Sequence, residues 1–171
     1  MNLQEVIWIK VLIHIHSFRE IFMEIVRANY EDLPEILDLQ KLAYLSEAKI
    51  LNDYSIQPLT QTLAELQNEF DKIIILKLYE DEENKIIGSI RAYEKNDRVY
   101  IGKVIVHPDY QNKGFGTKLL EKIETFYKNK KFELYTSSKS ERNLYLYKKL
   151  GFMEYKREKI SEDYDIIYLE K

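Results

Sequence analysis

The residues best suited to chemistry lie on a short loop with two glycines, Gln111-Asn112-Lys113-Gly114-Phe115-Gly116-Thr117. An apolar stretch ending at Val106 leads into this loop, and an amphipathic helix is predicted to follow it. Glycines leave backbone N–H groups accessible, and the first turn of a helix adds amides without intrahelical partners at the positive end of its dipole. The loop therefore has the donors to bind a diphosphate, although a helix N-terminus that binds nothing could carry the same residues.

Two other phosphate-binding motifs do not fit this loop. A Walker loop needs Gly-Lys-Ser/Thr at its end, but Gly116 is followed by Thr117 and Lys118, and no glycine stands five residues before it. A dinucleotide fingerprint needs a third glycine where this chain has Leu119, and it opens a βαβ unit instead of following three hairpin strands. Both motifs are excluded.

The surrounding pattern predicts a mixed α/β (α+β) fold, with helices packed on a mostly antiparallel sheet of about seven strands. The strands are predicted at 24–28, 73–79, 85–93, 99–106, 132–136, 152–159 and 163–169. The helices are predicted from 31, from 60, at 114–127 and at 140–150, with Asn29 and Thr60 as the first two N-caps. The resulting order is β-α-α-β-β-β-α-β-α-β-β, with an irregular segment at 52–59.

Composition favours one ordinary cytoplasmic domain. The 171 residues are 45% hydrophobic, which is enough to form a hydrophobic core without stabilisation by disulfides or metals. The 26 basic and 29 acidic residues give a net charge of −3, which provides no general attraction to nucleic acid or to an anionic membrane. The chain has no cysteine, which excludes disulfides and an acyl-cysteine intermediate. His14, His16 and His107 lack partners at metal-ligand spacing, so no metal site is expected.

Residues 1–22 are predicted to be an extension outside the core domain, which would cover 23–171. The apolar run from Val6 to Ile15 is interrupted by Lys10 and His14 and has no cleavage site after it, so we interpret it neither as a signal peptide nor as a membrane anchor. Its apolar side chains would be an exposed surface on a monomer, which makes a homodimer plausible.

The glycine loop and two further segments of the chain resemble one known family. The pattern of Gln111, Gly114 and Gly116 resembles the acyl-CoA loop of the GNAT superfamily of N-acetyltransferases. The strand exit at 105–108 and the run from Leu146 to Phe152 resemble two further parts of the same fold. These matches cover the C-terminal half of the chain.

The resemblance implies that acetyl-CoA is the co-substrate. Main-chain groups of Ile105 and Val106 would bind the pantetheine arm and polarise the thioester, in a V-shaped opening between the strand that ends at Val106 and the strand that ends near Thr136. The N–H groups of 111–117 would bind the pyrophosphate. Ser140 and Asn143 are alternative cofactor contacts, because many relatives place an asparagine where this chain has Ser140. Lys113, Lys139 or Arg142 would meet the 3′-phosphate.

The resemblance also implies a reaction without a covalent acyl-enzyme, in which a primary amine attacks the thioester in a ternary complex. Tyr147 is the expected general acid for the departing thiolate, although a chain with 14 tyrosines also uses them in its core. The general base is left open among Glu94, Glu133 and Asp53.

The segment 52–59, with Asp53 and Tyr54, is expected to contact the acceptor. The acceptor itself, a small molecule or a peptide, is also left open. The alternative is a non-catalytic module that binds CoA or a partner.

Overall fold

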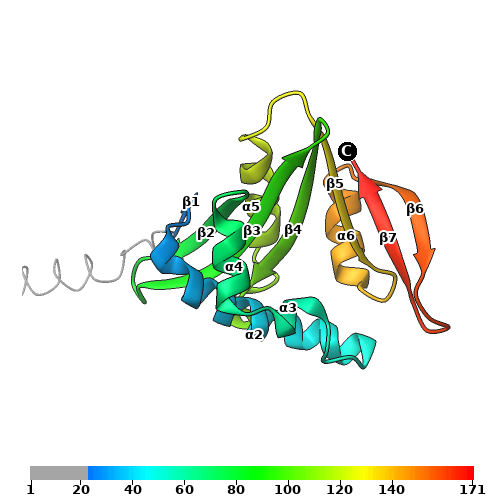
Figure 1. The fold of residues 1–171 in the computed structure, drawn as a ribbon, viewed down its shortest axis with the longest axis horizontal. Coiled ribbons are helices and arrows are strands. Elements are labelled where there is room, and N and C mark those ends of the chain that lie inside the picture. The colour runs from blue at the N-terminus through cyan, green and yellow to red at the C-terminus, as the bar shows by residue number, and fades with distance from the viewer. Residues whose placement is uncertain (1–22) are drawn as a thin grey trace, which may run out of the picture.

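The computed structural model describes residues 23–171, so the predicted extension at 1–22 lies outside the described residues. The described chain forms one seven-stranded sheet with helices packed on it, as Figure 1 shows. The elements are β1 (Met23–Arg27), η1 (Tyr30–Asp32), α2 (Leu33–Leu51), α3 (Gln57–Thr60), α4 (Leu63–Phe70), β2 (Ile74–Glu80), β3 (Lys85–Lys95), β4 (Arg98–Val106), η2 (Pro108–Tyr110), α5 (Phe115–Glu124), β5 (Lys131–Ser137), α6 (Glu141–Lys149), β6 (Met153–Lys159) and β7 (Asp165–Glu170). Within this range no helix has the length and hydropathy needed to span a bilayer.

The strand order in the sheet is β1-β2-β3-β4-β5-β7-β6. All neighbouring strands are antiparallel except β4 and β5, which are parallel and are connected through α5. The predicted class, a mixed and mostly antiparallel sheet of seven strands, is confirmed.

The alternation of apolar residues along the strands places helices on both faces. Leu76 belongs to a core cluster that includes Leu119 of α5, whereas the next residue toward the N-terminus, Ile75, belongs to a second cluster with Ile36 of α2 and Leu66 of α4. Successive strand residues point to opposite faces, so one run of apolar residues can fill both clusters. Figure 1 shows the same arrangement, with α4 in front of the sheet and α5 behind it.

Two predicted helix starts were wrong by two residues. The helix expected from Glu31 begins at Leu33, because the short turn η1 follows Asn29. The second long helix is capped by Thr62 and not by Thr60, because Thr62 and Glu65 form a capping box in which the Thr62 N–H donates to Glu65 Oε2 at 2.7 Å. Thr60 instead ends the short helix α3.

The sheet opens between β4 and β5. These strands pair only where Arg98–Tyr100 face Lys131–Glu133, and beyond this point Figure 1 shows them diverging. The Arg98 guanidinium binds the carboxylates of Glu133 and Glu170 at the closed end, and its Nη1 lies 3.0 Å from the Glu170 oxygen. The opening exposes one edge of β4 that no strand covers.

Candidate functional site

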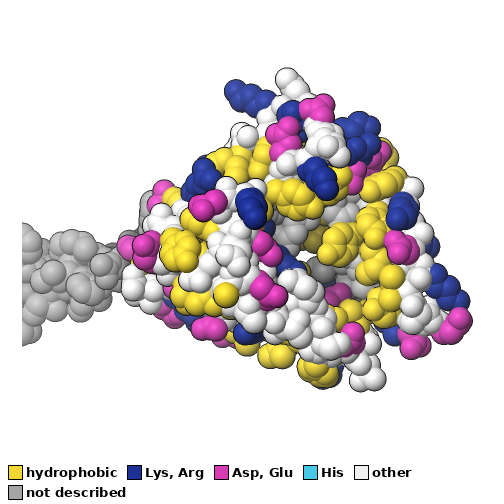
Figure 2. All heavy atoms as spheres, in the orientation of Figure 1, with side chains coloured by type: hydrophobic (Ala, Val, Ile, Leu, Met, Phe, Trp, Pro, Cys, Tyr) yellow, Lys and Arg dark blue, Asp and Glu magenta, His cyan; other side chains and the backbone are white. Residues whose placement is uncertain are grey.

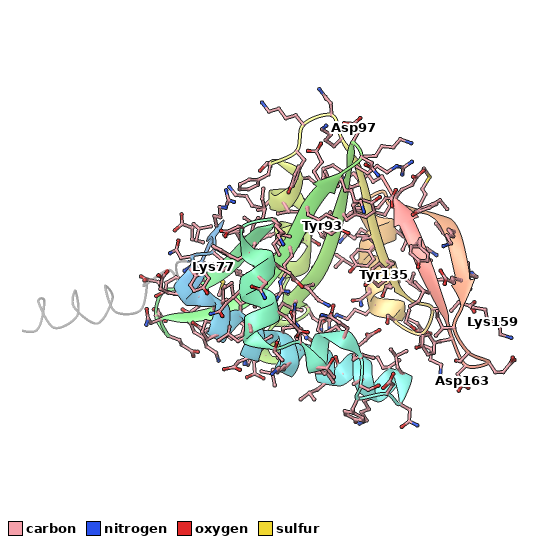
Figure 3. All side chains as sticks on the ribbon, in the orientation of Figure 1. Lys77, Tyr93, Asp97, Tyr135, Lys159 and Asp163 are labelled. Carbon is pink, nitrogen blue, oxygen red and sulfur yellow. The ribbon has the colours of Figure 1, made fainter. Side chains whose placement is uncertain are left out.

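A single cavity of about 1110 Å³ occupies the opening between β4 and β5. Figure 2 shows the surface hollowed at this place, and Figure 3 shows Tyr93 of β3 and Tyr135 of β5 on opposite sides of it. We call one part of the lining the Lys103 side, which comprises Gln57, Gln61, Glu69, Lys72, Arg91 and Lys103. We call the other part the Tyr147 side, which comprises Glu47, Val106, Thr136, Ser140, Asn143 and Tyr147.

The glycine loop lies between β4 and α5 and provides a row of free amides. Gly114 is the N-cap of α5 and adopts the left-handed conformation, with φ of 83°, which glycine adopts at little cost. Within the described chain, the N–H groups of residues 112–117 have no acceptor. They stand at the positive end of the α5 dipole, so this donor set suits a bound diphosphate, and the binding itself stays a prediction.

Gln111 ties this loop to both neighbouring elements. Its Nε2 donates to the Val106 carbonyl at 3.0 Å, and its Oε1 accepts from Arg142 Nη1 of α6 at 2.5 Å. Lys113, a predicted phosphate contact, lies over the ring of Tyr110 at 5.0 Å. The structure therefore brings the loop, the end of β4 and the start of α6 together.

The two predicted main-chain positions on β4 are not equivalent. The N–H of His107 donates to Ile87 of β3, and hydrogen bonds alternate in direction along an antiparallel pair. By this alternation the main-chain groups of Ile105 face β3, and the Ile105 carbonyl indeed lies against Gly88. Val106 faces the open edge, so it is the better placed of the two for a ligand in the cavity.

Ser140 and Asn143 both line the cavity, in different ways. The Ser140 hydroxyl is buried and donates to Glu47 of α2, which links α6 to α2 across the opening. Asn143 contacts β5 through Nδ2, which lies 3.4 Å from Thr136 Oγ1. The Ser140 hydroxyl is therefore engaged within the protein, while the Asn143 amide has one long contact and further capacity to bind.

The end of α6 fixes Tyr147. Gly151 adopts φ of 90°, the Phe152 N–H donates to the Tyr147 carbonyl at 3.0 Å, and the Gly151 N–H donates to Lys148 at 3.0 Å. These are the two hydrogen bonds of a Schellman motif, which also brings the first and last side chains of the turn together. The rings of Tyr147 and Phe152 meet edge to face at 6.1 Å. The residues from Leu146 to Phe152 thus form a helix C-terminus that holds Tyr147 in place.

Tyr147 is buried on the Tyr147 side of the cavity, and among the described residues its hydroxyl has no hydrogen-bond partner. Burial raises the pKa of Tyr147 well above its usual value of 10, and the negative charge of Glu47 raises it further. The phenol therefore keeps its proton at neutral pH and can donate a hydrogen bond into the cavity.

Sequence reasoning missed Glu47. Its Oε1 accepts from Ser140, and its other carboxylate oxygen has no partner among the described residues. Gln40, Tyr44 and Glu47 follow one another at spacings of four and three, which places them on one face of α2. Polar residues on a helix face that otherwise packs on the sheet are the signal that could have identified this wall of the cavity.

Sequence reasoning also missed the Lys103 side. Arg91 of β3 is 5% exposed, and its Nη2 and Nη1 donate to Gln40 at 2.7 Å and to Gln61 at 3.1 Å. Lys103 donates to Gln57 Oε1 at 2.6 Å, and burial lowers its pKa to about 8, with the charge of Arg91 as the second cause. These residues are far apart in the sequence and meet only when α2, α3 and the sheet are assembled.

Three of the residues predicted to contact the acceptor or to act as the general base, Asp53, Tyr54 and Glu94, do not line the cavity. Asp53 accepts from the N–H and hydroxyl of Ser55 in a local turn, at 2.7 and 2.6 Å. Tyr54 is exposed, and Glu94 pairs with Lys130 at 2.8 Å outside the opening. Glu133 does line it, but its carboxylate is bound by Arg98 and by the Tyr155 hydroxyl.

Similarity to known proteins agrees with this geometry. The chain matches the Acetyltransferase (GNAT) family over residues 22–152. It is 30% identical over 122 residues to UPF0157 protein YqkA of Bacillus subtilis (70% of this chain, 34% of that protein). It is 26% identical over 122 residues to the uncharacterized N-acetyltransferase ycf52 of Pyropia yezoensis (65% of this chain, 70% of that protein). The chain thus spans about a third of the Bacillus relative.

Solved structures of low sequence identity share the fold. A PaiA N-acetyltransferase from Thermoplasma acidophilum in complex with coenzyme A superimposes with a TM-score of 0.69 at 20% identity, covering 86% of this chain and 98% of that one. The ribosomal-protein-S18-alanine N-acetyltransferase from Escherichia coli gives 0.70 at 19% identity, covering 87% and 92%. The family match extends over well more than half of the chain, and the chain therefore belongs to the GNAT family of acetyltransferases, for which acetyl-CoA is the co-substrate.

Proposed function

We propose that this protein transfers the acetyl group of acetyl-CoA to a primary amine by direct attack in a ternary complex. One observation carries the proposal: a single cavity joins the Val106 end of β4, the phenol of Tyr147 and the carboxylate of Glu47. A thioester bound there would have a hydrogen-bond donor and a proton acceptor on the same side. The acceptor can be a small molecule or a peptide terminus.

The free amides of 112–117 would hold the pyrophosphate, with the α5 dipole adding to their hydrogen bonds. The open edge of β4 at Val106 would hydrogen-bond the pantetheine arm, and its amide would polarise the thioester carbonyl. Asn143 has a free donor for the same arm. Bound acetyl-CoA supplies an activated acyl group, so the protein needs to position it and to manage protons.

Tyr147 would act chiefly as a hydrogen-bond donor to the departing sulfur. A thiol has a pKa of about 8.5, and burial raises the pKa of Tyr147 above 10, so complete proton transfer from the phenol would be unfavourable by more than roughly 2 kcal/mol. Donation without transfer still stabilises the developing thiolate. A hydrogen bond to a charged group contributes about 1.5 to 3 kcal/mol, which corresponds to about a tenfold to hundredfold change in rate.

Glu47 would accept the proton that the attacking amine must lose. Ser140 holds one of its oxygens and thereby orients the other, which has no partner among the described residues. Glu47 is also close enough to Tyr147 for its charge to raise the pKa of the phenol. Donor and acceptor thus lie on the same side of the cavity, as a reaction with one attacking and one leaving group requires.

Calorimetry with acetyl-CoA and a thiol-release assay over a panel of amines would test the proposal. We expect Tyr147→Phe to lower kcat about tenfold to a hundredfold, with acetyl-CoA affinity unchanged. Tyr145→Phe is the matched control, because Tyr145 lies on the same helix and is 71% exposed. Glu47→Gln keeps an acceptor for Ser140 but removes the base, so it should lower kcat at least about tenfold.

Two results would contradict the proposal in different ways. Tight binding of acetyl-CoA without thiol release for every amine would favour a non-catalytic CoA-binding module. Unchanged turnover in Tyr147→Phe would remove Tyr147 from the mechanism, and the acetyltransferase activity would stand.

A further inference from the structure

Lys103 occupies an unusual position on β4. The register between β3 and β4 shifts between Ser89 and Arg91, so β4 contains a bulge, and Lys103 within it adopts φ of 52°. A left-handed conformation is unfavourable for a lysine, and such strained positions gather at functional sites. The side chain lines the cavity, and its Nζ lies 5.5 Å from the centre of the Tyr44 ring.

The positive charge on the Lys103 side is not balanced. Lys103 has no carboxylate within salt-bridge distance in the described part of the chain, and its close partner is the neutral amide of Gln57. Arg91 is bonded to two neutral amides, and the nearest carboxylate, Glu69, lies 3.8 Å away with its side chain 45% exposed. Lys72 also lines this side. Lys72 is exposed to solvent, so two cations that are at least partly buried, Arg91 and Lys103, face one carboxylate on this side.

Cations that are partly removed from water and lack a nearby negative charge are costly, and a ligand with a negative charge would relieve the cost. On the basis of the proposed acetyltransferase function, we propose that the acceptor carries a carboxylate as well as an amine, and that Lys103 binds this carboxylate with Arg91 as a second positive charge behind it. Such an acceptor has opposite charges at its two ends. Its ammonium would face Glu47 on the Tyr147 side, and its carboxylate would face the Lys103 side.

The donors that remain free on the Lys103 side can bind a carboxylate. Lys103 has three N–H donors, one of which is bound to Gln57. Arg91 has five, of which one on each Nη is bound to Gln40 and Gln61, and its buried Nε has no partner among the described residues. The remaining donors suit a group with one negative charge.

Matched pairs of amines would test the proposal. The probes are glycine, β-alanine and 5-aminopentanoate, each compared with its neutral amide, because the series varies the distance between amine and carboxylate. We expect the wild-type protein to acetylate at least one acid with kcat/KM about tenfold to a hundredfold above that of its amide. Lys103→Met should abolish this preference by lowering kcat/KM for the acid alone, and Lys103→Arg should keep part of it.

Lys95→Met is the matched control, since Lys95 is exposed at the far end of β3 and does not line the cavity. It should keep the preference for the acid, and acetyl-CoA affinity should be equal in all variants. If Lys103→Met does not fold, as judged by circular dichroism, Lys103→Gln takes its place. Amides that react as well as the acids, or a preference that survives in Lys103→Met, would overturn the proposal.

A second readout separates this proposal from the proposed function. Calorimetry would measure binding of the N-acetylated acids and amides, which resemble the products, to the protein saturated with CoA. Tighter binding of the acids to wild type than to Lys103→Met supports the carboxylate site, even if no amine is acetylated. The absence of acetylation would overturn the acetyltransferase function but not the carboxylate site. Equal binding of acids and amides would overturn the carboxylate site.

Discussion

A matched pair of substitutions at Gly114 tests whether the amides of 112–117 bind the diphosphate of acetyl-CoA. Gly114 is the N-cap of α5, and a Cβ added there would meet no atom within 4 Å, so a side chain fits without a clash. Asparagine and aspartate have the same shape, and both tolerate the left-handed conformation better than other residues do. The effects of side-chain size and backbone strain are therefore equal in Gly114→Asp and Gly114→Asn, and any difference between the two variants comes from the charge.

The charge should act in opposite directions on stability and on binding. At the positive end of α5 a carboxylate stabilises the free protein by about 0.3 to 1 kcal/mol, which raises Tm by about 1 to 4 °C. A phosphate bound to the same amides would lie roughly 6 Å from that carboxylate, and one pair of like charges at this distance repels by about 0.7 kcal/mol in water and about 2.8 kcal/mol at an effective dielectric constant of 20. A value near 2 kcal/mol corresponds to a loss of affinity of about thirtyfold.

The assay is calorimetric titration of both variants with acetyl-CoA, beside thermal unfolding of the free proteins. We expect Gly114→Asp to unfold at a slightly higher temperature than Gly114→Asn and yet to bind acetyl-CoA about thirtyfold more weakly. The difference should shrink at high salt, because the loop is exposed to solvent. Equal affinities of the two variants in low salt would refute diphosphate binding at these amides, since the added carboxylate would have to repel a diphosphate bound there.

Further predictions concern stability and packing. Gly88→Ala should lower the free energy of unfolding by about 1 to 3 kcal/mol in urea denaturation, because the added Cβ would lie 3.2 Å from the Ile105 carbonyl and from Leu119; an unchanged midpoint would contradict this packing. Lys103→Met should raise Tm at pH 7 by removing a half-buried cation. Burial lowers the pKa of Lys103 to about 8, so between about pH 8 and 10.5 the unfolded chain binds more protons than the folded protein, and wild-type stability rises with pH. The higher Tm of Lys103→Met should therefore disappear in this range. A difference in Tm between the two proteins that stays constant with pH would exclude the charge of Lys103 as its cause.

Much of the fold could be predicted because its signals are local. Alternating apolar residues identified the strands, and the spacing of Leu119 and Ile123 identified α5. Helix starts were less certain, because several residues near 60 can act as caps. Thr60 and Thr62 have equal intrinsic capping ability, and only the reciprocal bond with Glu65 decides between them.

The site could be predicted only where its residues are neighbours in the sequence. The glycine loop and the turn after Tyr147 are short segments whose backbone geometry requires particular residues, so the sequence indicates both segments, while their roles in binding and catalysis stay predictions. Glu47 and Lys103 lie on different elements and reach one cavity through the packing of α2 and the bulge in β4. A single lysine or glutamate has no pattern of its own, so its role depends on long-range contacts that the sequence does not display.

The two sides of the cavity differ in what the fold gains from them. Phe152 and the Schellman motif on the Tyr147 side contribute packing and hydrogen bonds to the fold. Lys103 combines a left-handed backbone with a half-buried charge, and each of these lowers stability. A methionine at this position would avoid the charge, and a glycine would avoid the strain. The stability of the fold therefore does not explain why a lysine stands at position 103. Binding of an anionic group by its side chain is a sufficient physical reason.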